Sequence, residues 1–95
     1  MRQYEVMLIL SAEADESVVG GAVDRITKIV SDSGGEVTNV DRWGRKRLAF
    51  EISNQSEGYY VVAEVRAEPS AIPELERTLH LADEVLRHKV VVRAA

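Results

Sequence analysis

The chain has 95 residues, a formal net charge of −4 at pH 7 and no cysteine. This length favours one domain over residues 1–95, and the lack of cysteine excludes disulfides, thiol nucleophiles and thiolate metal sites. Two histidines without a carboxylate cluster at ligand spacing predict no metal site. Because no signal peptide and no membrane-length apolar run is present, we expect a cytoplasmic protein.

The first half of the chain predicts a strand followed by a helix. Residues 4–10 alternate in hydrophobicity, as is typical of a strand with one buried face. Residues 18–30 carry apolar side chains at helical spacing, with Asp15 or Ser17 as the candidate N-cap. The pair Gly34-Gly35 is expected to end this helix.

A long hairpin follows the first helix. Its predicted strands are residues 36–52 and 58–67, joined by the polar segment SNQSEG. Val37 and Val40 lie three positions apart and cannot share one face of an unbroken strand, so we expect a bulge between them. In the strand of residues 36–52, the alternation predicts that Arg45 and Arg47 share a face with Trp43.

A second helix from about Ser70 and a last strand over residues 85–93 complete the order β-α-β-β-α-β. This order predicts a ferredoxin-like split βαβ sandwich of the α+β class. Its four-stranded antiparallel sheet has the strand order four, one, three, two, and both helices cover one face. The other face is open and is expected to show apolar, aromatic and cationic side chains: Met7, Ile9, Trp43, Arg45, Arg47, Tyr60 and Val62.

Positive charge is concentrated in two segments without acids, residues 42–47 and residues 85–95. Together they hold seven of the twelve basic residues: Arg42, Arg45, Lys46, Arg47, Arg87, Lys89 and Arg93. Such segments favour contact with RNA phosphates even though the net charge is negative. The alternative explanation is that they protect the two edge strands from aggregation.

The residues do not support catalysis. The segment SAEADES after the first strand is acidic and lacks glycine, whereas a phosphate-binding loop or an acylphosphatase-like site needs a basic, glycine-rich turn. The nucleophile motif G-x-S-x-G is absent from the sequence. We therefore expect no enzyme and no cofactor.

Two other classes of protein share the predicted fold. An RRM-like protein binds single-stranded RNA by stacking bases on third-strand aromatics. Residues 57–64 carry only part of that signature, and Glu64 would repel an RNA strand laid across the sheet. A ferredoxin-like regulatory or dimerisation module is the second alternative.

Four segments, in order along the whole chain, resemble the bacterial small-subunit (30S) ribosomal protein six family. They are the opening Met1-Arg2-x-Tyr4-Glu5, the block WGRKRLAF at 43–50, EGYY at 57–60 and LHLADEVLR at 79–87. The resemblance implies a non-enzymatic constituent of the small ribosomal subunit. It also implies binding to the central domain of the small-subunit ribosomal RNA jointly with small-subunit ribosomal protein eighteen, a small basic partner.

The resemblance places Arg2, with Tyr4 beside it, and Arg87 near the RNA. It assigns the basic second strand either to the RNA or to the partner protein, without dividing its residues between the two. Adding the charge pattern, the expected contact residues are Arg2, Tyr4, Arg42, Trp43, Arg45, Lys46, Arg47, Tyr60, Arg87, Lys89 and Arg93. Because 16 acidic residues repel RNA, we expect weak binding by the protein alone. A basic partner would supply the missing charge and cover the open sheet face.

Overall fold

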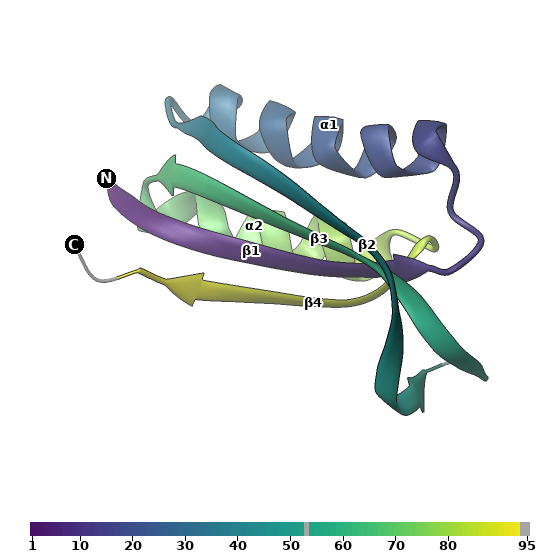
Figure 1. The fold of residues 1–95 in the computed structure, drawn as a ribbon. Helices are drawn as coiled ribbons and strands as arrows, with labels where there is room; N and C mark the ends of the chain where they lie inside the picture. The colour runs from purple at the N-terminus through teal and green to yellow at the C-terminus, as the bar shows by residue number, and fades with distance from the viewer. Residues whose placement is uncertain (53, 94–95) are drawn as a thin grey trace.

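The computed structural model describes residues 1–52 and 54–93, which follow the order β-α-β-β-α-β (Figure 1). The elements are β1 (Arg2–Ser11), α1 (Glu16–Asp32), β2 (Glu36–Ile52), β3 (Gln55–Ala67), the 3₁₀ turn η1 (Pro69–Ala71), α2 (Ile72–Leu81) and β4 (Val85–Val92). All sheet pairings are antiparallel, and the strand order is β2-β3-β1-β4. This is the predicted order read from the opposite edge, so the predicted ferredoxin-like fold is confirmed.

The hydrophobic core lies between the two helices and one face of the sheet. Alternate residues of β1 point into it, and Val6, Leu8 and Leu10 have no exposed surface. The helices contribute their apolar stripes, which include Val19, Ala22, Ile26, Val30, Leu75 and Leu79. Each large aliphatic side chain buried in this way contributes about 1.5–3 kcal/mol to stability. Among the described residues no polar or charged side chain is buried, so apolar packing holds the two layers together.

Both ends of α1 follow the local chemistry of the sequence. The Asp15 carboxylate is the N-cap, accepting a hydrogen bond of 3.0 Å from the Val18 N–H and one of 2.8 Å from the Ser17 hydroxyl. These two bonds, that of Val18 first, lower the pKa of Asp15 below its ordinary 3.8. At the other end Gly34 adopts a φ of +86°, a left-handed conformation that costs glycine little, and this ends the helix.

The register of β2 against β3 shifts at three places, of which the sequence predicts only the first and the third lies between Arg47 and Ile52. The register to β3 shifts between Val37 and Asn39, which confirms the predicted bulge. A second shift lies between Arg42 and Gly44, where Gly44 has a φ of +83°. An extra residue in a strand reverses the faces of all residues that follow it. The side chains after Gly44 therefore point to the faces opposite to those predicted.

The hairpin between β2 and β3 is tighter than predicted. Strand β3 begins at Gln55, so most of the segment SNQSEG belongs to a strand and not to a loop. Asn54 has a φ of +65°, which asparagine tolerates better than most residues and which allows a short turn. Ser53 lies outside the described residues. The far end of the hairpin extends beyond β1 and β4, as Figure 1 shows.

Replacing Gly21 with alanine should stabilise the fold, whereas replacing Gly35 should destabilise it. A Cβ at Gly21 meets nothing within 4 Å, so Gly21→Ala should raise the free energy of unfolding by about 1 kcal/mol through helix propensity. A Cβ at Gly35 would lie 2.1 Å from the Arg66 carbonyl oxygen, so Gly35→Ala should cost about 1–3 kcal/mol. Urea denaturation of both variants measures the free energies of unfolding, and equal values for the two variants would contradict this prediction.

Candidate functional site

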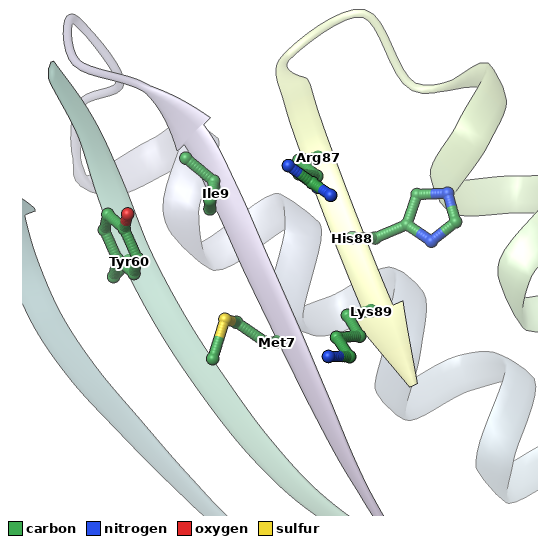
Figure 2. Close-up of a pocket in the computed structure, with 6 residues that line it drawn as sticks. All are labelled: Met7, Ile9, Tyr60, Arg87, His88 and Lys89. Carbon is green, nitrogen blue, oxygen red and sulfur yellow. The ribbon is translucent and has the colours of Figure 1, made fainter. Parts of the chain in front are cut away.

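The sheet face opposite the helices carries a hollow of about 240 Å³ (Figure 2). Residues from three adjacent strands line it: Met7 and Ile9 from β1, Tyr60 from β3, and Arg87, His88 and Lys89 from β4. The register pairs Ile9 with both Tyr60 and Arg87, and Met7 with Lys89, so these five side chains share a face. The His88 side chain turns away toward α2, where its ring lies 6.3 Å from that of His80.

A second hollow of about 110 Å³ continues the first toward the hairpin. The two hollows share Ile9, Tyr60 and Arg87, and the second adds Leu48, Ala49, Phe50 and Ile52. We call the surface formed by both sets of lining residues the open-face groove. Its floor is apolar, and Phe50 at the hairpin is 81% exposed. Contiguous exposed apolar surface of this kind indicates that a partner covers it.

The cations beside the open-face groove differ in whether the protein already pairs them. Arg87 and Lys89 are exposed and form no ion pair with any described residue. Arg93 lies about 13 Å beyond Lys89 along the strand direction, by strand rise, and is instead held by Glu5 at 2.5 Å and Glu64 at 3.6 Å. Arg87 and Lys89 therefore offer an anion the positive charge that Arg93 has already given to two carboxylates.

The bulge at Gly44 corrects the predicted faces of the second strand. Arg45 lies opposite Tyr59 and donates a hydrogen bond of 2.8 Å to the Ala12 carbonyl oxygen, so it does not reach the open face. Arg47 lies opposite Glu57 and shares the face of Arg45. The prediction that Arg45 and Arg47 lie on the open face is therefore wrong, because it assumed unbroken alternation through a strand that contains an extra residue.

Lys46 occupies the open face instead. It lies opposite Gly58, and its ammonium nitrogen is 5.1 Å from the centre of the Trp43 ring, a cation–π contact. Trp43 in turn stacks on Tyr60 with ring centres 6.3 Å apart and an interplanar angle of 5°. Arg42 points to the helical side and pairs with Glu16 at the start of α1. The basic segment of β2 thus divides between the two faces of the sheet.

The structure also corrects the expected role of Tyr4. This residue shares the strand phase of Val6 and Leu8, and its side chain is buried in the core at 4% exposure. A buried ring offers no surface to RNA or to a partner, so Tyr4 stabilises the fold and its neighbour Arg2 is the exposed residue of the pair.

A further cationic hollow of about 410 Å³ lies at the opposite end of β1. It is lined by Met1, Arg2, Gln3, Arg66, Val92 and Arg93. Arg66 was missed in the sequence because it lies in a mostly acidic region, and only the pairing of β3 with β1 brings it beside Gln3. Its pair with Glu36 is long, 3.7 Å, between two exposed side chains.

Charge is divided between the two layers of the molecule. Nine of the twelve basic residues lie in the strands or directly after β4, whereas ten of the sixteen acids lie in the helices and connections. The sheet is therefore the positive side of an acidic protein, and a polyanion is attracted to it. Within residues 1–52 and 54–93, no group of three His, Asp or Glu residues could hold a metal ion, and no helix is suited to cross a membrane.

Arg93→Gln should lower the free energy of unfolding by about 0.5–1 kcal/mol at low salt. Glu5 and Glu64 lie directly opposite each other on β1 and β3, and Arg93 contacts both, so its loss leaves two like charges side by side. The matched control Arg66→Gln removes only the long pair with Glu36 and should cost less. Urea denaturation at low and high salt measures both. A loss for Arg93→Gln that salt does not reduce would contradict the explanation.

The sequence matches the family model for ribosomal protein S6 over residues 3–92. It is 45% identical to small ribosomal subunit protein bS6 of Saccharopolyspora erythraea, over 98% of this chain and 79% of that protein. The corresponding protein of Mycobacterium leprae is 46% identical, over 96% of this chain and 95% of that protein. These relatives match nearly the full length of the chain.

Solved structures agree with the sequence matches. The crystal structure of 30S ribosomal protein S6 from Thermotoga maritima superposes with a TM-score of 0.87 at 30% identity, covering 97% of this chain and 87% of that one. The C-terminal domain of the MgtC protein from Mycobacterium tuberculosis has a TM-score of 0.65 at 12% identity, and this likeness shows the fold alone. The family match, the full-length relatives and the structural match together show that the chain belongs to the ribosomal protein S6 family, structural proteins of the small ribosomal subunit.

Proposed function

We propose that this small-subunit protein binds the central domain of the small-subunit ribosomal RNA jointly with small-subunit ribosomal protein eighteen. The proposal is based on the position of Arg87 and Lys89. Both cations are exposed, form no ion pair with any described residue and lie beside an apolar groove. A surface that combines unpaired cations with exposed apolar area suits a joint RNA and protein interface.

The RNA contacts come from the cations that the protein does not use internally. These are the exposed residues on or beside the sheet whose side chains form neither an ion pair nor a hydrogen bond with a described residue: Arg2, Lys46, Arg47, Arg87 and Lys89. Arg42 and Arg93 already neutralise Glu16 and Glu5, so they contribute less to phosphate binding. Five available cations allow only a few phosphate contacts, and each contact releases about one counterion.

The partner compensates for two properties of the isolated chain. The ten acids of the helical layer and its connections repel RNA at long range, and a basic partner reduces that repulsion. The hairpin part of the open-face groove, Leu48, Ala49, Phe50 and Ile52, also exposes the large side chain of Phe50, and a protein partner there removes that surface from water. Joint binding therefore gains both electrostatic and hydrophobic free energy that neither component supplies alone.

Gel-shift titration of a central-domain RNA fragment tests the need for a partner. The isolated protein should bind with a Kd above the micromolar range, because few of its cations are free and its net charge is −4. Adding ribosomal protein eighteen should give tight binding that weakens steeply with salt. Submicromolar, specific binding by the protein alone would contradict the proposal.

A charge-matched pair of variants tests the role of the sheet edge. Arg87→Gln should weaken the ternary complex and reduce the slope of log K against log salt by about one, whereas Arg77→Gln on the helical side should change neither. Neither substitution should shift the melting temperature. Leu75→Ala, at a core position, should lower the free energy of unfolding by about 2–5 kcal/mol. Equal RNA affinities of the two arginine variants would contradict the assignment of Arg87 to RNA binding.

A further inference from the structure

The hollow beside Tyr60 has the composition of a site for a flat, partly charged ligand. Met7 and Ile9 form an apolar floor, Tyr60 adds an aromatic ring, and Arg87 and Lys89 stand on the β4 side (Figure 2). Its volume of about 240 Å³ is below the range of pockets that enclose drug-sized molecules. It therefore suits one ring system held at the surface, and not a whole cofactor.

The charges around this hollow favour an anion. Arg87 and Lys89 form no ion pair with any described residue. Of the acids on the same face, Glu5 and Glu64 lie further along the strands against Arg93, and Asp41 and Glu36 lie on β2, opposite Val62 and Arg66. An anion at Arg87 and Lys89 thus gains two unpaired cations and meets no carboxylate in the lining of the hollow.

The aromatic ring of the hollow is held rigidly. Tyr60 stacks on Trp43 at an interplanar angle of 5°, and Lys46 lies over the Trp43 ring. A ring fixed by a neighbour loses little conformational entropy when a ligand packs against it. Arginine guanidinium planes and aromatic rings are the surfaces on which proteins stack unpaired RNA bases, and both line this hollow.

We propose that the hollow binds one unpaired nucleobase of single-stranded RNA, with the base on Met7, Ile9 and Tyr60 and its phosphate at Arg87 and Lys89. The ribosomal RNA is the natural source of that nucleotide, so in the ribosome the inference rests on the proposed function. It adds a base contact to the phosphate contacts, and it assigns Tyr60 to RNA.

This mode differs from that of an RRM-like protein. An RNA strand that crosses the whole sheet would pass Glu5 and Glu64, which lie opposite each other in the middle strands. A single base that enters from the edge strand β4 reaches the hollow without passing them. The carboxylates therefore limit the RNA to one end of the face.

The chain provides two natural reporters for a direct test. It has one tryptophan, Trp43, which stacks on Tyr60, and two methionines. Met7 lines the proposed base site, whereas Met1 lines the cationic hollow at the other end of β1. In protein labelled with ¹³C at the methionine methyl groups, the two NMR signals therefore report separately on the two hollows.

The probes are a short oligouridine and an abasic ribose-phosphate chain of the same length. Oligouridine should shift the Met7 signal and quench Trp43 fluorescence, whereas the abasic chain, which offers the same phosphates, should bind about tenfold more weakly. Equal affinities for the two chains, or an unshifted Met7 signal at saturating oligouridine, would overturn the proposal.

Variants separate stacking from charge. Tyr60→Leu should weaken oligouridine binding about tenfold and leave the abasic chain unaffected, and Tyr60→Phe should restore binding. Arg87→Gln should weaken both probes, and the control Arg77→Gln neither. Melting curves establish that each variant is folded. If Tyr60→Leu unfolds the protein, Tyr60→Phe still tests the base site, because it keeps the aromatic ring and removes only the hydroxyl. Loss of oligouridine binding by Tyr60→Phe, measured by the Met7 signal, would contradict stacking on the ring.

Two further outcomes distinguish this inference from the proposed function. If the protein forms the complex with its partner and the central-domain RNA but does not discriminate oligouridine from the abasic chain, the base site is wrong and the proposed function stands. If the protein discriminates the two probes but forms no such complex, the base site stands and the proposed function is wrong. If ribosomal protein eighteen alone shifts Met7 and blocks oligouridine, the hollow belongs to the protein partner and the proposal falls.

Discussion

Both helices pack on the same face of the sheet, and the rest of the molecule depends on this constraint. Strands β1 and β2 are parallel with β3 between them, and β3 and β4 are parallel with β1 between them. Right-handed crossovers then place both helices on one side. All of the fully buried aliphatic residues face that side, and no helix among residues 1–52 and 54–93 covers the other. The exposed face, with Met7, Tyr60 and the hairpin beyond it, is a consequence of the topology.

The internal ion pairs determine which charges on that face are available. Arg93 neutralises the opposed pair Glu5 and Glu64, and Arg42 neutralises Glu16, so two cations of the acid-free segments serve the fold. Arg87 and Lys89 form no ion pair with any described residue. The negative net charge is therefore compatible with RNA binding, because most acids lie in the helical layer and its connections, away from these two residues. Because of the same acids, we expect a basic companion to strengthen the interaction.

Local patterns predicted most of the fold. The helix of residues 18–30, its Asp15 cap and the bulge between Val37 and Val40 follow from spacing and capping chemistry, which act over a few residues. The bulge at Gly44 was not predicted, because the alternation around it was assumed to be unbroken, although a glycine inside a strand often marks a bulge. That one residue moved Arg45 and Arg47 off the open face and placed Lys46 on it.

The site was less predictable than the fold because it depends on pairings between distant segments. Arg42 and Glu16 are 26 positions apart, and Arg93 and Glu5 are 88 apart, so no local pattern shows that these arginines are paired. The burial of Tyr4, in contrast, could have been predicted, since it shares the phase of Val6 and Leu8.

We propose that Arg87 and Lys89, the cations of the open sheet face without an ion pair among the described residues, hold this protein in the small subunit. Competitive reconstitution tests it most directly: wild-type protein competes for incorporation into small subunits against a variant with Arg87→Gln and Lys89→Gln. A control variant with Lys28→Gln and Arg77→Gln loses the same charge from the helical side. We expect wild-type protein to displace the sheet variant, more so at higher salt, and the control variant to compete equally with wild type. Equal incorporation of both variants would contradict it.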